Sequence, residues 1–174
     1  MLRLGCSALL LAALPEAAQA RAYAERWSAG ALAGHAAVLV QSALPVHGLV
    51  ASARAAVPLD DVWEIRATAG YAWHPSGRPL HVGIGALDAV YRLDVATLVP
   101  VFGLGLSGLL TAYDSRVGLD AGLTGCVGLD WFVAPDLVVL LEVRPHVLLL
   151  GLPAGLVEPV YVNTLVGVLW LFEP

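Results

Sequence analysis

Residues 117–150 contain the feature that most restricts the fold, two long apolar–polar alternations separated by a short turn. In 117–131 the odd-numbered positions are mostly apolar and the even-numbered ones are small or acidic. In 137–149 the odd-numbered positions are again apolar, and the even-numbered ones include Glu142, Arg144 and His146. Strand side chains alternate between two faces, so each segment has one apolar face. Both segments run about a dozen residues, roughly twice the usual length of a strand in a soluble sheet.

Residues 62–74 indicate the height of the apolar surface that such a strand would present. Their odd-numbered positions are apolar, with Trp63 and Trp73 at the two ends, and their even-numbered positions include Glu64 and Arg66. About ten residue steps of about 3.4 Å, tilted by about 40°, give roughly 26 Å of height, which matches the apolar band of a transmembrane β-barrel. We therefore predict that the apolar face contacts lipid. The aromatic side chains expected to form the interfacial girdles are Trp63, Tyr71, Trp73, Trp131, Trp170 and Phe172.

The remaining segments extend the pattern to eight strands. The other strands are expected at 27–41, 47–57, 80–92, 97–113 and 160–172. The predicted fold is all-β, an eight-stranded antiparallel up-and-down transmembrane β-barrel, and the even number of strands places both termini on one side. Two alternatives stay open. Residues 95–113 carry no charge and could form a membrane helix, although Pro100 opposes it. A soluble lipocalin-like barrel is also eight-stranded, but its apolar residues would face inward.

The N-terminal residues indicate export. Arg3 precedes the apolar run 8–14, and Ala18-Gln19-Ala20 has the small-x-small form of a cleavage site, so residues 1–20 are predicted to be a signal peptide and 21–174 the barrel domain. Cys126 would be the single cysteine of the mature chain, which excludes an internal disulfide. The few basic residues form no cluster, which argues against nucleic-acid binding. A mean hydropathy of +0.78 is high for a soluble secreted domain.

Three features resemble the small eight-stranded outer-membrane barrels, the OmpA-type transmembrane domain and its relatives. They are the signal peptide, the Gly-Leu-Asp-Trp-Phe…Ala-Pro-Asp hairpin at 128–136, and the aromatic ending at 170–172. The resemblance covers the mature chain and implies a bacterial outer-membrane location, a monomer in the lipid bilayer, and recognition of the last strand by the barrel assembly machinery. Glu173 and Pro174 follow Phe172, which departs from that family's ending. The resemblance implies no single activity, since one fold hosts many functions.

Charged residues at even-numbered positions are predicted to face the interior. Opposite charges there should pair, because an unpaired buried charge is costly. Asp88 has a less clear orientation. One hypothesis is a structural or interaction protein with a polar, salt-bridged and largely plugged interior, and the alternative is a narrow channel or transporter for small solutes or ions. The expected interior network comprises Arg54, Glu64, Arg66, Asp120, Asp130, Glu142 and Arg144.

We predict no catalytic activity and no cofactor. Ser52 and Ser107 lack a clear set of acid and base partners, and Cys126 is expected to fill space inside the barrel. The histidines fall toward one rim, where they could be interfacial polar residues, a pH sensor or ligands of a transition metal. They match no known ligand spacing, so no metal site is assigned. The five residues are His35, His47, His74, His81 and His146.

Overall fold

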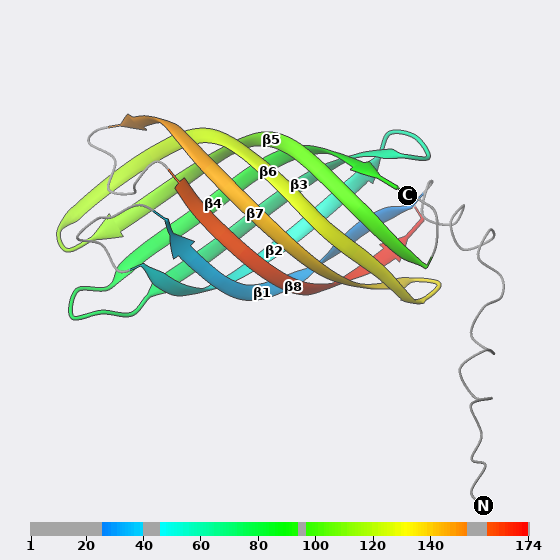
Figure 1. The fold of residues 1–174 in the computed structure, drawn as a ribbon, viewed down its shortest axis with the longest axis horizontal. Helices are drawn as coiled ribbons and strands as arrows, with labels where there is room; N and C mark the ends of the chain where they lie inside the picture. The colour runs from blue at the N-terminus through cyan, green and yellow to red at the C-terminus, as the bar shows by residue number, and fades with distance from the viewer. Residues whose placement is uncertain (1–25, 40–45, 94–96, 153–159, 174) are drawn as a thin grey trace, which may run out of the picture.

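Eight antiparallel strands close into a single barrel in the computed structural model, which describes residues 26–39, 46–93, 97–152 and 160–173 (Figure 1). The strands are β1 (Trp27–Val38), β2 (His47–Pro58), β3 (Trp63–His74), β4 (Leu80–Arg92), β5 (Leu98–Tyr113), β6 (Arg116–Ala134), β7 (Leu137–Leu152) and β8 (Val160–Phe172).

Each strand pairs with its neighbours in the sequence, and β1 pairs with β8 to close the sheet. The pairing runs from Trp27 opposite Phe172 to Val38 opposite Tyr161, so the start of β1 and the end of β8 lie at the same end of the barrel. The predicted all-β, eight-stranded antiparallel barrel is thereby confirmed, whereas the predicted signal peptide lies outside the described residues. The helix considered for 95–113 is excluded from Leu98 onward, because that part of the chain is strand β5. Within the described ranges no helix is long and apolar enough to cross a membrane.

The outer surface of the barrel is apolar. Leu104 and Leu106 of β5 are 68% and 65% exposed, and leucine, valine and aromatic side chains occupy the outward positions of the other strands. The inward positions hold many buried polar and charged side chains, including Arg66 and Glu142. This polarity is the reverse of that in a soluble barrel, so the lipocalin-like alternative is not supported.

The interior is not polar throughout. Leu80, Val82 and Ile84 of β4 are buried and pack in one apolar cluster with Leu109 of β5. In β5, leucine side chains therefore occupy both faces, because Leu110 points outward next to the inward Leu109. In β4, by contrast, the outward neighbours of this stretch are His81 and Gly83. An eight-stranded barrel is just wide enough to be filled by side chains, and inward apolar groups serve this purpose as well as polar ones.

The alternation of inward and outward side chains also fails near the C-terminal end of β7. The β6–β7 register shifts between Ala121 and Gly122, because Ala121 pairs with Leu150 and Gly122 pairs with Leu148. Leu149 is the additional residue, and both Leu149 and Leu150 are more than 60% exposed, at 62% and 65%. A bulge of this kind places two consecutive side chains on one face and bends the strand.

A glycine on β5 creates space for an interior charge. A β-carbon added at Gly105 would collide with the carbonyl oxygen of Leu87 and would come within 2.8 Å of a carboxylate oxygen of Asp88. Gly105 is the direct β5 partner of Asp88. Glycine therefore allows the close approach of backbone and side chain that the interior charge at this position requires.

Candidate functional site

Eight charged side chains meet inside the barrel, four arginines and four carboxylates. Each is at most 2% exposed, and they come from five strands, because alternate positions of β2, β3, β4, β6 and β7 direct them inward. The group, which we call the charge network, consists of Arg54, Glu64, Arg66, Asp88, Arg92, Asp130, Glu142 and Arg144.

Glu142 lies at the centre of the charge network. Its Oε1 accepts hydrogen bonds from Arg54 Nη2 at 2.6 Å and from Arg144 Nε at 3.0 Å. Its Oε2 is 3.4 Å from Nη1 of Arg66. One buried carboxylate thus faces three guanidinium groups, an arrangement that charge-assisted hydrogen bonds stabilise strongly.

The other carboxylates complete the pairing of these arginines. Arg66 Nη2 donates to Asp130 Oδ2 at 2.8 Å, and its Nε donates to Glu64. Glu64 Oε2 is also 3.4 Å from Nη1 of Arg92. Arg144 Nη1 on β7 donates to Asp88 Oδ2 on β4 at 2.6 Å. All eight side chains are therefore connected by ion pairs, and equal numbers of arginines and carboxylates make the network neutral when all are ionised.

Asp120 differs from the other residues expected in the network. It points inward from β6 and is 3% exposed, but it makes no ion pair with any residue that the structure describes. Its backbone neighbours across the sheet are Leu109 and Gly151, neither of which offers a charge. Its Oδ2 atom has no hydrogen-bond partner within the described ranges.

Two members of the charge network were not assigned to it from the sequence. Asp88 had an unclear orientation, and Arg92, which was expected on the same face as Asp88, was left out of the expected network. Both occupy even-numbered positions of β4 and point inward. Their inward orientation could have been predicted from the period-two spacing, which places them on the same face as Leu80, Val82 and Ile84. Because these three residues are apolar, that face did not look like an inward, polar one.

The five histidines do not form one cluster. His74 and His146 point into the barrel with no exposed surface, and both rings lie near Tyr161, at centroid distances of 5.7 and 6.0 Å. His35 and His47 lie on the outer surface instead. No group of three or more His, Cys, Asp or Glu side chains that could hold a metal ion occurs within the part of the chain that the structure describes.

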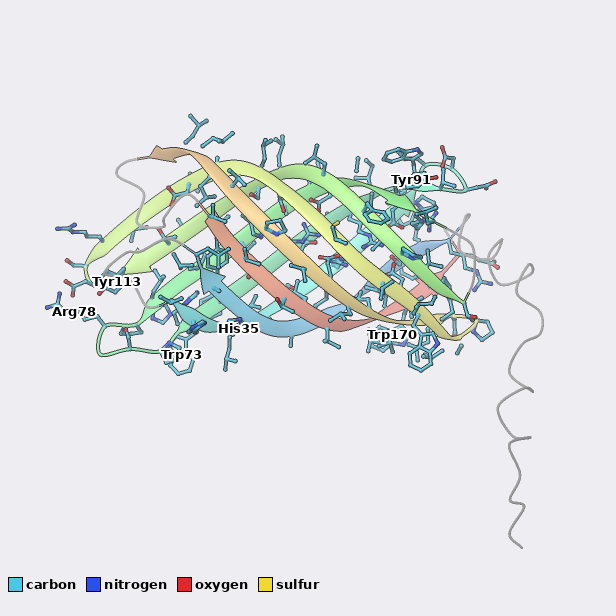
Figure 2. The ribbon with its side chains drawn as sticks, in the orientation of Figure 1. His35, Trp73, Arg78, Tyr91, Tyr113 and Trp170 are labelled. Atoms are coloured by element: carbon cyan, nitrogen blue, oxygen red, sulfur yellow. The ribbon has the colours of Figure 1, made fainter. Side chains whose placement is uncertain are left out.

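The aromatic residues expected in the girdles all point outward. Trp63, Trp131 and Trp170 lie toward the end of the barrel where β1 begins and β8 ends, and Trp73 lies toward the opposite end. Figure 2 labels Trp170 and Trp73 at these two ends. The four tryptophans are between 42% and 55% exposed. Tyr71 and Phe172 are exposed as well, at 51% and 43%.

Ser52, Ser107 and Cys126 have no activating partner among the described residues. The hydroxyl oxygens of Ser52 and Ser107 are buried and form no hydrogen bond with the described residues. Cys126 is free and 2% exposed, packed in a small cluster with Val90, Val99 and Val101. A nucleophile of an enzyme needs an adjacent base or a stabilised anion, and these three positions show neither.

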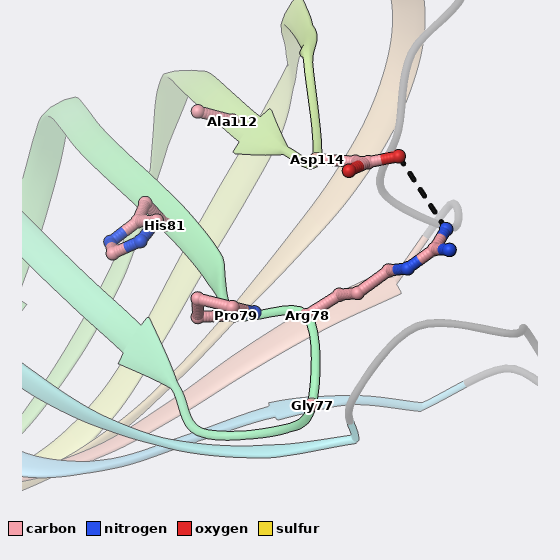
Figure 3. A pocket seen from close by; sticks show the side chains of 6 residues that line it. All are labelled: Gly77, Arg78, Pro79, His81, Ala112 and Asp114. Carbon is pink, nitrogen blue, oxygen red and sulfur yellow. Dashed lines mark hydrogen bonds and ion pairs between the residues drawn. The ribbon is translucent and has the colours of Figure 1, made fainter.

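A cavity of about 320 Å³ lies at the rim of the barrel, between the β3–β4 and β5–β6 turns (Figure 3). Arg78 reaches over it to Asp114, with 3.5 Å between Nη1 and Oδ2, and His81 lies on its wall. The two charged side chains are 69% and 57% exposed. An exposed ion pair of this length contributes little to stability, so this is an open rim pocket and not a preorganised site.

Solved structures with the same architecture are known. The Neisserial surface protein A superposes with a TM-score of 0.71 at 16% identity, over 85% of this chain and 97% of that one. The chain has the fold of the small eight-stranded outer-membrane β-barrels. The outer-membrane protein OprG of Pseudomonas aeruginosa gives a TM-score of 0.64 at 12% identity, over 87% and 98% of the two chains.

The attachment invasion locus protein Ail of Yersinia pestis, solved in complex with the heparin analogue sucrose octasulfate, gives a TM-score of 0.55. Its identity is 13%, over 84% of this chain and 97% of that one. Neither a protein-family model nor a curated protein matches the sequence. At these identities the outer-membrane barrel fold is the shared property.

Proposed function

We propose that this chain is an integral β-barrel of the bacterial outer membrane with a structural or interaction role and a closed interior. The apolar outer surface between two levels of aromatic residues supports insertion into a bilayer. The structural neighbours are outer-membrane proteins, which supports the same location. Export through the predicted signal peptide 1–20 and insertion by the barrel assembly machinery are parts of this proposal. So is a monomeric state, because a closed barrel leaves no strand edge to pair.

The observation that carries the proposal is the direction of the ion pairs in the charge network. Arg54 on β2 pairs with Glu142 on β7, although β1 and β8 lie between these strands around the wall. Arg66 on β3 pairs with Asp130 on β6, and β4 and β5 lie between them. These pairs therefore cross the lumen instead of following the wall. Side chains that meet across so narrow a barrel obstruct any axial path.

Single-channel recording in planar lipid bilayers tests the closed interior. We expect the refolded wild-type protein to show no stepwise conductance, because the cross-lumen pairs fill the barrel. The Glu142→Gln variant keeps the arginines in place, so it should also show no stepwise conductance when it first inserts into the bilayer. Arg78→Gln serves as the matched control, since this arginine is exposed at the rim. A steady wild-type conductance whose ion selectivity changes in Glu142→Gln but not in Arg78→Gln would reject the proposal.

A narrow conduit for ions or protons is the second candidate function. Several buried polar atoms of the interior have no hydrogen-bond partner within the described residues, among them Asp120 Oδ2, His146 Nδ1 and Asn163 Oδ1. Buried polar atoms are usually satisfied, so such atoms favour contact with water or a passing ion. The same recordings decide between the two functions. Asp120→Asn should reduce a cation current if the conduit exists.

A further inference from the structure

His35 and His47 lie side by side on the outer surface of the barrel, on the neighbouring strands β1 and β2. His35 is opposite Leu49, and His47 is opposite Ala37, so the two histidines are diagonal neighbours on the outward face. Both side chains are exposed. They lie toward the end of the barrel away from the chain termini, where Figure 2 labels His35 near Trp73. Diagonal pairs of this kind are within reach of long or aromatic side chains.

The two imidazole rings are arranged so that their nitrogen atoms face each other. Nε2 of His35 and Nδ1 of His47 share a hydrogen bond of 3.1 Å, and the ring centroids are 5.1 Å apart with a tilt of 39°. A metal ion bound by both nitrogens would take the place of the shared proton. A zinc–imidazole bond is about 2.0–2.1 Å long, so two such bonds at an angle of about 98° join nitrogens about 3.1 Å apart. This angle lies between the square-planar and tetrahedral values. The nitrogen separation therefore suits two ligands of one metal ion.

We propose that His35 and His47 form a two-histidine site for a divalent transition-metal cation. The site goes beyond the proposed function of the barrel, because it lies on the outer surface and shares no residue with the charge network. Neutral imidazole is a ligand for zinc, copper and nickel, and Cu²⁺ binds nitrogen sites most tightly among these divalent ions. Both rings lie on the outward face near the Trp73 end of the barrel, where the aromatic girdle meets the lipid headgroups, so water or a headgroup can fill the remaining coordination positions.

The other histidines of the described chain are arranged differently. Nδ1 of His81 is hydrogen bonded to the hydroxyl group of Tyr71. His74 is hydrogen bonded to Tyr161, and His146 accepts a hydrogen bond from Asn163, and neither has exposed surface. Among the described residues, His35 and His47 are thus the histidines that combine mutual contact with access from outside. A metal held by both would connect β1 to β2 and would stabilise the folded barrel, because the unfolded chain lacks the paired geometry.

Copper titration of the folded full-length protein in detergent micelles tests this site. Isothermal titration calorimetry with CuCl₂ should give one saturable transition with one ion per chain, and electron paramagnetic resonance should show coupling to two imidazole nitrogens. His35→Gln and His47→Gln should each abolish the transition. His81→Gln is the matched control, since His81 also faces outward near this rim, and it should bind copper as the wild type does.

Folding of each variant is checked by heat-dependent gel migration, and the wild-type protein in urea provides a second comparison. The unfolded wild type keeps all histidines, so loss of the one-ion transition in urea supports a site made by the fold. The proposal is rejected if the folded wild type shows no saturable transition. It is also rejected if the double variant H35Q/H47Q retains the transition, if His81→Gln loses it, or if the unfolded wild type binds equally well.

Discussion

At the residue scale, the charge balance of the barrel interior depends on one carboxylate that faces three arginines. Glu142 contacts Arg54, Arg66 and Arg144, so its removal leaves three guanidinium groups with fewer carboxylates to compensate them. Asp120 has the opposite surroundings, because it is buried without an ion pair among the described residues. The same change of carboxylate to amide should therefore have different effects at these two positions.

We predict that Glu142→Gln lowers the free energy of unfolding by about 3–5 kcal/mol, since removing one partner of a buried ionic group leaves uncompensated charge. Asp120→Asn should change it by less than about 1 kcal/mol or should stabilise the barrel, because it removes a buried charge that has no ion pair. Urea unfolding in lipid vesicles, followed by tryptophan fluorescence, measures both values. Equal destabilisation by the two variants would contradict the pairing that the structure shows.

At the element scale, the period-two alternation predicted eight strands, and it gave the outward face of those in which apolar and polar positions alternate clearly. It worked because lipid on one side of the wall demands apolar residues at every second position, as in β3 and β6. It did not define a face for β1, which is rich in alanine and glycine. It was less informative for the interior. Inward positions can hold apolar side chains, as at Leu80 and Val82, so Asp88 had an unclear orientation and Arg92 was left out of the expected network. The bulge at Leu149 and the cross-lumen pairs depend on strand register and closure, which a single sequence does not specify.

The girdle interpretation of β3 gives a prediction about depth in the membrane. Trp63 and Trp73 lie at opposite ends of this strand and point outward, whereas Ala69 points outward near its middle. In variants that keep a single tryptophan, Trp63 and Trp73 should be quenched most by bromine atoms near the lipid headgroups. Ala69→Trp, with only small partners opposite it in Ala53 and Gly85, should be quenched most by bromine near the bilayer centre. Equal depth profiles at the three positions would contradict a membrane-spanning β3.

At the scale of the whole molecule, the two ends of the barrel differ in their connections. The end with the chain termini carries the connections 59–62, 93–97 and 135–136. The opposite end carries 39–46, 75–79, 114–115 and 153–159, which include the two longest. Bacterial outer-membrane barrels have short periplasmic turns and longer extracellular loops. This asymmetry supports an orientation with the termini in the periplasm, which places the His35–His47 pair toward the cell exterior.

Cysteine labelling of intact cells tests this orientation. Gly77 lies in the β3–β4 turn and Asp61 in the β2–β3 turn, and both are exposed at opposite ends of β3. A β-carbon at Gly77 meets no other atom within 4 Å, so Gly77→Cys should fold normally. A membrane-impermeant maleimide should label Gly77→Cys in intact cells, and it should label Asp61→Cys only after the outer membrane is disrupted. The wild type, whose Cys126 is buried, controls for background labelling. The reverse pattern would show that the barrel is inserted the other way round, and labelling of both sites in intact cells would argue against a sealed outer-membrane location.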